Sequence, residues 1–437
     1  MLVGLASIVG SGLISPKGGM MRPVVVPLAI LMVATLGCGS SSKSPPDPGN
    51  NPGAGGSGGD PVGGGPDGGI DDPDGGTVNT ACSRVGSETR LTTTGSPARM
   101  PAIAWDGSGY LVVWSDERQG NGDIYAAKVD ANGTKSSEWV VVEGPEQSRS
   151  PTIARVGDGY VVAWFDTTPI GADVKIIALD SGGKPSGMPS LLAASTSDNP
   201  RPIVAPAFNG AAVAWSDKKG TVPSASVALV NGSAQLTVPA VSLGNGTAAA
   251  EFPAPAGGDG KLAVFYSDGR DGHANIRATL FSEQLTAQQD VVVRDAPNDA
   301  FNVRATWDGE QFVAAWEDLR VQDREYIFLS RLSPSGTASN SVTVPESDAD
   351  GSWPTLARAK SGVAIAYYQF RGGPPQIFVS YMNKAGDFVR SDVQVSQTTG
   401  RARFPSIAFD GNSTLGVAWE DTRAGHQEVY FARVQCP

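Results

Sequence analysis

An aromatic residue that ends a run of apolar residues recurs seven times along this chain of 437 residues, at intervals of 50 to 52 positions. Self-similarity at such an interval indicates repeated supersecondary units, each of which can bury its apolar face only against its neighbours. The seven residues are Trp114, Trp164, Trp215, Tyr266, Trp316, Tyr367 and Trp419. The chain is therefore expected to form an array of seven similar units.

The first unit shows which elements build the repeat. It contains four short segments rich in apolar and β-branched residues, at 101–105, 110–114, 123–129 and 138–142. Asp106-Gly107, between the first two segments, predicts a tight hairpin, because such a turn needs positive φ. Nothing in the unit has helical periodicity. Four short antiparallel strands per unit describe a propeller blade, so we predict an all-β, seven-bladed β-propeller of four-stranded antiparallel blades over residues 82–437.

The two ends of the array predict how the ring closes. The seventh unit stops after its third strand, near Cys436, and Glu88–Leu91 precedes the first unit as a fourth strand would. The N-terminal strand is therefore expected to complete the last blade, which leaves no open sheet edge. Cys82 and Cys436 would then meet at the seam, where an exported protein can keep a disulfide. Two unrelated free thiols are the alternative.

The N-terminus carries the features of an export signal. An apolar run over 23–37 stops at Cys38 and is shorter than the roughly 20 residues of a membrane-spanning helix. The small residues around Cys38 resemble the lipobox of bacterial lipoproteins, although Thr35 stands where that family usually has leucine. The resemblance implies a signal peptide over 1–38, lipidation of Cys38, and a lipid anchor in the outer membrane of a bacterial cell envelope, on its periplasmic or its outer surface. Ordinary cleavage without lipidation is the alternative.

Composition and charge narrow the possibilities further. Residues 39–80 are dominated by Gly, Pro, Ser and Asp and have little apolar area to bury, so they are expected to be a disordered tether. The formal net charge of −11 argues against nucleic acid as a partner, because nucleic-acid binding needs a basic patch. The chain has only two histidines, which argues against catalysis or metal binding by histidine.

The turn after the second strand carries a second repeated pattern. In the first unit it is Ser-Asp-x-Arg-x-Gly-x-x-Asp-Ile-Tyr over 115–125, and shorter forms recur over 268–276 and 421–430. This pattern resembles the repeat of TolB-type periplasmic propellers. It departs from that family in the residue between Asp and Arg, and in having seven repeats instead of six. The resemblance implies a non-enzymatic envelope protein that docks other proteins.

These turns lie at one end of a propeller, where they would form a ring of charged side chains. One interpretation is a binding face on which arginines contact an anionic or polar partner. The other is structural: each Asp caps its own turn, and each Arg pairs with a neighbouring blade. The candidate residues are Asp116, Arg118, Asp268, Arg270, Asp318, Arg320, Arg371, Asp421 and Arg423.

Two further groups of polar residues were considered as metal ligands. Carboxylates alternate at Glu346, Asp348 and Asp350, as they do in calcium loops, but the later bidentate Glu of an EF-hand is missing. A solvated acidic turn is the main interpretation and calcium the alternative. His273 and His426 occupy equivalent turns three blades apart and are expected to be exposed loop residues. No other metal or cofactor is expected.

The tryptophans fall into two classes. Those that end the second strands are expected to pack between blades and not to stack on a sugar, because they close fully apolar strands. Four others are candidates for exposed aromatic side chains, and a lectin function would depend on them: Trp105, Trp139, Trp307 and Trp353.

Together these features predict a monomeric, non-enzymatic envelope lipoprotein that displays a propeller to bind or scaffold an envelope or surface protein, with no catalytic residues. A carbohydrate-binding, lectin-like propeller is the first alternative, and an exposed aromatic in the central depression would favour it. A sialidase-like glycoside hydrolase is the second, and two facing carboxylates about 5–10 Å apart would favour it. A ring of charges with neither feature would favour protein docking.

Overall fold

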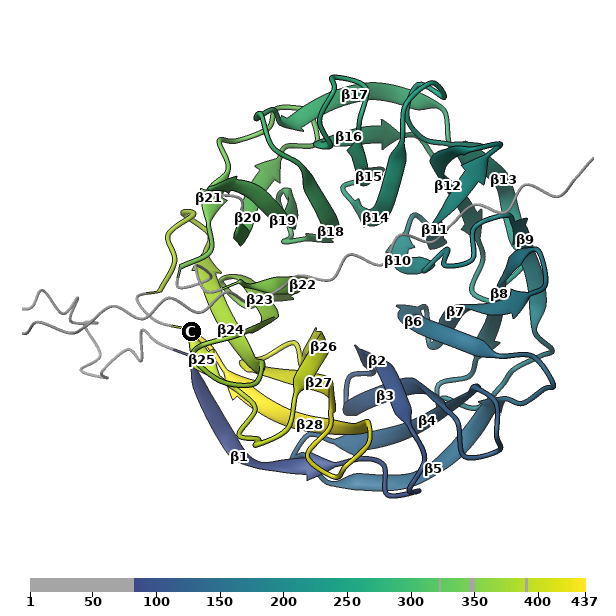
Figure 1. Cartoon of the computed structure of the whole chain (residues 1–437), viewed down its shortest axis with the longest axis vertical. Coiled ribbons are helices and arrows are strands. Elements are labelled where there is room, and N and C mark those ends of the chain that lie inside the picture. The colour runs from purple at the N-terminus through teal and green to yellow at the C-terminus, as the bar shows by residue number, and fades with distance from the viewer. Residues whose placement is uncertain (1–81, 322–323, 346–349, 390–391) are drawn as a thin grey trace, which may run out of the picture. The chain divides into compact units, whose positions relative to one another are not determined.

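The chain folds into seven four-stranded antiparallel sheets, arranged as blades around a central channel (Figure 1). The computed structural model describes residues 82–321, 324–345, 350–389 and 392–437. In these ranges every regular element is a strand, and no helix is present that could cross a membrane. The predicted seven-bladed, all-β propeller is therefore confirmed. The predicted signal peptide, Cys38 and the predicted tether lie outside the described residues.

Six blades follow one another along the chain, and each runs from its inner to its outer strand. Blades 1 to 3 consist of β2 (Ala98–Trp105), β3 (Gly109–Asp116), β4 (Asp123–Asp130) and β5 (Lys135–Val142); β6 (Ser148–Val156), β7 (Gly159–Thr168), β8 (Gly171–Leu179) and β9 (Ser190–Ser195); and β10 (Ile203–Ala207), β11 (Gly210–Lys219), β12 (Val222–Val230) and β13 (Leu236–Ser242). Blades 4 to 6 consist of β14 (Ala250–Gly258), β15 (Lys261–Asp268), β16 (Asn275–Phe281) and β17 (Ala287–Arg294); β18 (Ala300–Trp307), β19 (Phe312–Val321), β20 (Arg324–Leu332) and β21 (Val342–Thr343); and β22 (Ser352–Ala359), β23 (Gly362–Gln369), β24 (Gln376–Asn383) and β25 (Val393–Gln394).

The seventh blade joins the two ends of the propeller. It consists of β26 (Ala402–Phe409), β27 (Thr414–Asp421), β28 (Glu428–Gln435) and, as its outer strand, β1 (Ser83–Arg90). Strand β1 lies antiparallel to β28, with Ser83 opposite Gln435 and Arg90 opposite Tyr430, and Figure 1 shows the two strands side by side. Cys82 and Cys436 form a disulfide across a sequence separation of 354. The predicted strand exchange and the predicted disulfide are both confirmed.

The hydrophobic core consists of seven clusters of described residues, one at each interface between consecutive blades. The second strands supply much of it, and all eight residues of β3 are buried. The five tryptophans that end these strands are at most 2% exposed: Trp114, Trp164, Trp215, Trp316 and Trp419. They pack between blades as predicted, so the repeated aromatic residue is a packing residue.

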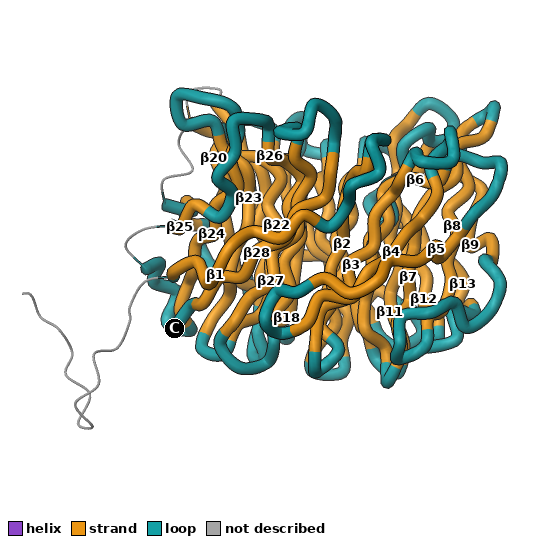
Figure 2. The backbone as a smooth tube through the Cα atoms, turned by 90° about the horizontal axis from the view of Figure 1, so that it is seen from below, coloured by secondary structure: helices purple, strands orange, loops and turns teal. Residues whose placement is uncertain are grey.

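The two ends of the ring differ in the elements that they carry. In blade 1, Ala98 lies opposite Asp116, whereas Trp105 lies opposite Tyr110 next to the hairpin. The starts of the inner strands therefore share one end of the ring with the charged turns, which we call the turn face. The hairpins between inner and second strands close the other end, the hairpin face. Figure 2 shows the strands running between these two faces. The described chain enters at the hairpin face, because Ser83 pairs with the last residue of β28.

Candidate functional site

The aspartates of the charged turns are bonded inside their own blades. Asp116, at the end of β3, accepts the indole N–H of Trp114 at 2.9 Å and the backbone N–H of Arg118 at 3.0 Å. The same pair of bonds recurs at Asp318 and Asp421. Each of these carboxylates therefore caps its own turn and anchors the buried aromatic residue of the repeat.

The arginine of each turn lies across its own blade. The guanidinium of Arg118 pairs with Asp116 at 2.6 Å, lies 4.0 Å from the ring centre of Tyr125 on β4, and reaches Glu138 on β5. The expectation that these arginines pair with a neighbouring blade is therefore wrong. The equivalent contacts on or beside the fourth strand are Arg270–Asp290, Arg320–Ser341, Arg371–Asp392 and Arg423–Glu88. These bonds lie within blades. Binding of a partner by the ring of charged side chains therefore stays a prediction.

A residue with a left-handed backbone conformation stands at the same place in all seven blades. Its φ lies between 42° and 57°, a region that residues other than glycine rarely occupy. In six inner strands the pairing register shifts at this residue, which forms a β-bulge. We call the seven residues the bulge ring: Met100, Ser150, Arg201, Phe252, Asn302, Trp353 and Phe404. The backbone is the same around the ring, whereas the side chains are of six kinds.

Side chains of the preceding blade hold several of these bulges in place. The Glu317 carboxylate accepts the backbone N–H of Trp353 at 2.6 Å and the side-chain N–H of Asn302 at 3.0 Å. The Ser216 hydroxyl accepts the backbone N–H of Phe252 at 3.2 Å. Bonds between blades therefore hold the unusual backbone conformation at Trp353 and Phe252.

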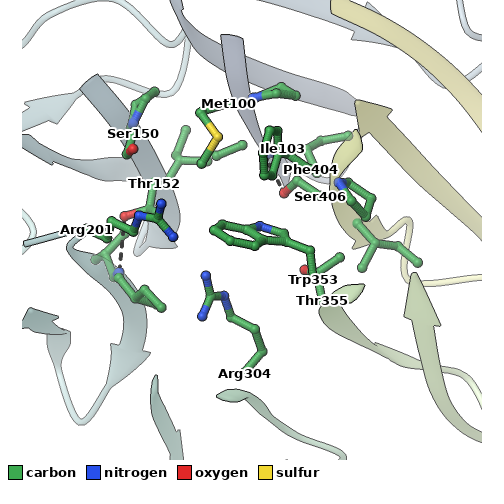
Figure 3. A pocket seen from close by; sticks show the side chains of 18 of the residues that line it. Met100, Ile103, Ser150, Thr152, Arg201, Arg304, Trp353, Thr355, Phe404 and Ser406 are labelled. Atoms are coloured by element: carbon green, nitrogen blue, oxygen red, sulfur yellow. Dashed lines mark hydrogen bonds between the residues drawn. The ribbon is translucent and has the colours of Figure 1, made fainter. Parts of the chain in front are cut away.

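Five members of the bulge ring line a pocket of about 210 Å³ in the central channel (Figure 3). The pocket lies toward the turn face, since the bulge residues that line it stand near the starts of the inner strands. The prolines that follow the bulge residues form much of its wall, and Arg304 from β18 reaches it as well. Drug-sized ligands occupy roughly 300–1,000 Å³, so this pocket fits a single small group.

Two arginines meet beside one tryptophan in this pocket. The guanidinium carbons of Arg201 and Arg304 lie 4.8 Å and 5.5 Å from the ring centre of Trp353, and Figure 3 shows both groups next to the indole. Arg201 donates Nε–H to the Asn199 side chain at 3.1 Å, and Arg304 donates Nη1–H to the Val303 carbonyl at 2.9 Å. Within the described ranges neither guanidinium forms an ion pair, and their other N–H groups have no protein acceptor.

The electrostatics of the pocket reflect two neighbouring cations. Burial, together with the charge of Arg201, lowers the pKa of Arg304 to about 10, against the opposing effect of Glu317. Burial also lowers the pKa of Arg201. Beneath Trp353, burial, together with the charge of Glu325, raises the pKa of Glu317 to about 7, against the hydrogen bonds that the carboxylate accepts. The pocket is therefore cationic and poorly solvated.

The remaining polar side chains of the pocket are hydroxyls. No Asp or Glu of the described residues lines it. The Thr152 hydroxyl donates to the Pro202 carbonyl at 3.1 Å, and the Ser406 hydroxyl accepts the Ile103 N–H at 3.2 Å, so both bonds join neighbouring blades. Ser150 and Thr355 add two further hydroxyls to the lining.

The four tryptophans considered as exposed aromatics are all half-buried, and three of them reach the channel. Trp353 lines the cationic pocket, and Trp105 and Trp307 line a second pocket of about 490 Å³ toward the hairpin face. Trp139 lies outside these pockets, with the Lys184 ammonium 3.7 Å from its ring centre, and it donates its indole N–H to the Gly183 carbonyl.

The candidate metal ligands are not brought together in the described part of the chain. His273 is exposed as predicted, whereas His426 is half-buried and bonds to Glu428 at 2.7 Å. Of the acidic residues considered for calcium, Glu346 and Asp348 lie outside the described residues, and Asp350 pairs with Arg324 at 3.3 Å. The described residues contain no group of three or more His, Cys, Asp or Glu that could hold a metal ion.

Comparisons with known proteins identify the fold only. No protein-family model and no curated protein sequence match this chain. A protein of unknown function from Dyadobacter fermentans is 12% identical with a TM-score of 0.53, over 82% of this chain and 100% of that one. The β-propeller domain of the Trilobed protease from Pyrococcus furiosus is 9% identical with a TM-score of 0.49, over 77% and 93%. A leech intramolecular trans-sialidase is 9% identical with a TM-score of 0.45, over 80% and 70%.

Fold and pocket together define a β-propeller with a cationic pocket in its channel. In this particular chain, five of the seven blades share a Trp-x-Asp core, and the seven bulge residues are of six kinds. The bulge ring is not among the sequence-based predictions, although a signal existed. The residue before the recurring proline is the bulge residue in six of seven blades, and it varies while the proline does not.

Proposed function

We propose that this protein is a non-enzymatic binding protein of a bacterial cell envelope, anchored through Cys38, and that the turn face of its propeller holds a partner protein. The bulge ring carries this proposal. Left-handed backbone at a residue other than glycine costs about 1–3 kcal/mol, and such conformations cluster at ligand sites. Here the cost recurs in seven blades while the side chains vary, which is the pattern of a recognition surface.

The position at which the chain enters the propeller also supports partner binding at the turn face. The propeller begins beside Cys82 at the hairpin face, so a lipid anchor on the N-terminal side of Cys82 would leave the turn face accessible. The charged turns surround the pocket on that face and would form a polar rim around an inserted side chain. A polar rim around a small buried contact is the usual arrangement of a protein–protein interface.

The two alternatives differ in their support. Glycoside hydrolysis depends on a pair of carboxylates near the sugar or, in sialidases, on a tyrosine nucleophile, and no described carboxylate or tyrosine lines the pocket. Carbohydrate binding keeps one observation in its favour, because Trp353 is a half-exposed aromatic in the central depression. However, both guanidinium groups lie against its ring, and much of the remaining wall is apolar, with Met100, Phe404 and several prolines. Carbohydrate binding is therefore the second candidate.

Photo-crosslinking in cells tests the proposal on the full-length protein. A photoreactive amino acid at Ser150, in the bulge ring, is expected to cross-link to one protein partner. The control places the same amino acid at Leu236, which is 52% exposed on the outer strand of blade 3 and should not capture that partner. Absence of a cross-linked protein at Ser150 would contradict protein binding. A glycan-array signal in that case would support the second candidate.

A further inference from the structure

We infer that Arg201 and Arg304 bind a single carboxylate group of the partner, either an acidic side chain or a C-terminus, beside the indole of Trp353. This inference rests on the proposed function and adds the chemical group that the pocket recognises. Nothing in the repeat requires this pair: Arg201 belongs to the bulge ring, whereas Arg304 stands two residues after the bulge residue of blade 5.

Within the part of the chain that the structure describes, the two guanidinium groups leave most of their hydrogen-bond donors unused. A guanidinium carries five N–H donors in a planar fork that matches the two oxygens of a carboxylate. Each arginine donates one N–H to a protein acceptor: Arg201 to the Asn199 side chain and Arg304 to the Val303 carbonyl. By contrast, the arginines of the charged turns pair with carboxylates of their own blades. The pocket thus presents two guanidinium groups whose natural partner the described protein does not supply.

The charge of the pocket favours an anionic group. Two cations that share a half-buried site repel each other and are poorly hydrated, so an incoming anion relieves both effects. The planar fork of a guanidinium matches a carboxylate, and a comparison with inorganic phosphate tests this preference.

The size and polarity of the pocket suit one carboxylate next to an apolar group. The pocket volume of about 210 Å³ accommodates one residue and not an extended chain. Its walls include Met100, Phe404 and several prolines, which suit an apolar side chain or backbone next to the carboxylate.

Binding of small acids to the full-length protein tests the inference by calorimetry. The probe is N-acetylphenylalanine, which carries one carboxylate next to an apolar side chain, and its neutral match is N-acetylphenylalanine amide. We expect the acid to bind at least about tenfold more tightly than the amide, since a hydrogen bond to a charged group contributes about 1.5–3 kcal/mol. N-acetylaspartic acid α-amide, whose only free carboxylate is that of the side chain, tests the side-chain source of the carboxylate, and inorganic phosphate tests a general anion site.

Variants of the two arginines complete the test. Arg201→Met and Arg304→Met should each lower the affinity for the acid about tenfold or more, and Arg304→Lys should lower it less. Arg149→Met is the matched control, because Arg149 is exposed next to the bulge ring and does not line the pocket. Equal binding of acid and amide, preference for phosphate, absence of binding up to the solubility limit, or wild-type affinity in both methionine variants would overturn the inference. If cross-links from Ser150 persist under any of these outcomes, the proposed function stands and only the carboxylate site is wrong.

Discussion

The Glu317 carboxylate accepts the backbone N–H of Trp353 at 2.6 Å, so a buried acid of blade 5 fixes the conformation of a pocket residue of blade 6. Glu420 occupies the equivalent place in blade 7, and Met100 of blade 1 donates its backbone N–H to it. Both acids lie between the aromatic residue and the aspartate of their repeats. Titration of these two acids therefore affects the hydrogen bonds that hold Trp353 and Met100 of the bulge ring.

The stability of the protein should fall as the pH rises from about 5 to 8. Burial raises the pKa of Glu317 and of Glu420 to about 7, above the ordinary value of 4.5. The folded state then binds more protons than the unfolded state between these values, so stability is lost with rising pH, by up to about 3 kcal/mol for each acid. Urea denaturation at several pH values measures this loss. Glu317→Gln, which keeps the acceptor oxygen, should flatten the profile, whereas the exposed Glu283→Gln should not; equal profiles would refute the coupling.

Replacing Arg304 by Met should stabilise the protein while it weakens ligand binding. The Arg304 cation is half-buried next to Arg201 and has no ion pair among the described residues, so its removal relieves desolvation and repulsion. The expected gain is about 1–3 kcal/mol, measured by thermal unfolding. Arg118→Met is the control and should destabilise, because Arg118 pairs with Asp116 and Glu138. A loss of stability in Arg304→Met would show that this arginine has a structural role instead.

The repeated residues made the fold accessible from the sequence alone. The seven aromatic residues at regular intervals predicted seven blades, and the Asp-Gly pairs predicted the hairpins. The incomplete seventh unit and Glu88–Leu91 predicted the seam, which the pairing of β1 with β28 confirms. Such features are visible in one sequence because the same physical demand, packing a blade against its neighbours, recurs seven times.

The pocket could not be found in this way. Arg201 and Arg304 stand in different blades and at different places of the repeat, so no pattern connects them. The residue before a proline favours extended backbone, and left-handed φ at Trp353 or Met100 is therefore not what local preference predicts. Bonds such as that of Glu317 to the next blade override this preference. They depend on the register between blades, which only the folded structure shows.

The aspartates of the charged turns should contribute different amounts to the stability of the protein from blade to blade. Asp318 is fully buried, and it accepts bonds from Trp316, Arg320 and Arg294. Burial alone would raise its pKa, but the arginine and indole donors outweigh this effect and lower it. Asp318→Ala should cost about 3–5 kcal/mol in urea denaturation, because it leaves buried charged donors without a partner.

Asp217 of blade 3 is the matched control for this substitution. The indole N–H of Trp215 has no partner there, and the Asp217 carboxylate bonds to Ser195 and to nearby backbone. Asp217→Ala should therefore cost only about 1 kcal/mol. Equal losses in the two variants would show that the aspartate contributes through its turn alone.

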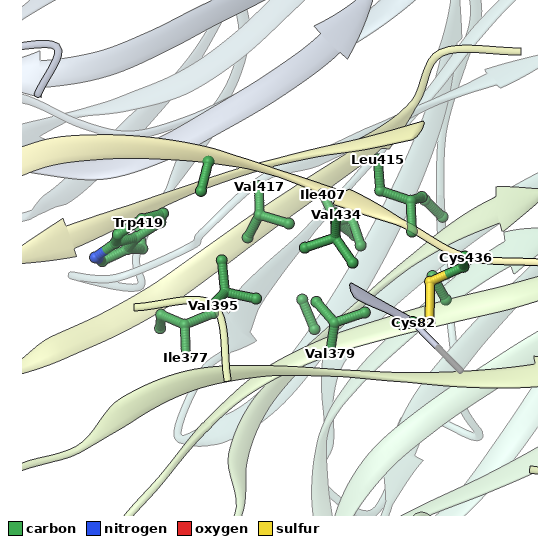
Figure 4. Close-up of a cluster of buried hydrophobic side chains, with 14 of the residues drawn as sticks. Cys82, Ile377, Val379, Val395, Ile407, Leu415, Val417, Trp419, Val434 and Cys436 are labelled. Atoms are coloured by element: carbon green, nitrogen blue, oxygen red, sulfur yellow. A yellow bond between two sulfur atoms is a disulfide. The ribbon is translucent and has the colours of Figure 1, made fainter. Parts of the chain in front are cut away.

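The Cys82–Cys436 disulfide should stabilise the propeller without determining its strand content. The bond lies at the edge of the cluster between blades 6 and 7 and closes a loop with a sequence separation of 354 (Figure 4). Chain entropy alone gives roughly 5–6 kcal/mol for such a loop, an upper bound that measured bridges seldom reach. Cys436→Ser should therefore lower stability by a few kcal/mol with an unchanged circular-dichroism spectrum. Reduction of the wild-type protein should reproduce the loss, and unchanged melting in both cases would contradict a stabilising seam.

Replacing a bulge residue by glycine should show how much the left-handed backbone lowers the free energy of unfolding. Ser150 has a φ of 49°, which glycine adopts without strain, so Ser150→Gly should stabilise the protein by about 1 kcal/mol. Ser137 on β5 is an exposed serine without positive φ, and there the same change should destabilise by about 0.5–1 kcal/mol, because glycine only adds freedom to the unfolded chain. Chemical denaturation of the two variants compares these signs directly. If both variants lose stability, the bulge carries no strain, and the main argument for a recognition surface at this position falls. If the signs differ as expected, the wild-type chain keeps a serine where glycine is more stable, which favours a role for that side chain beyond the blade.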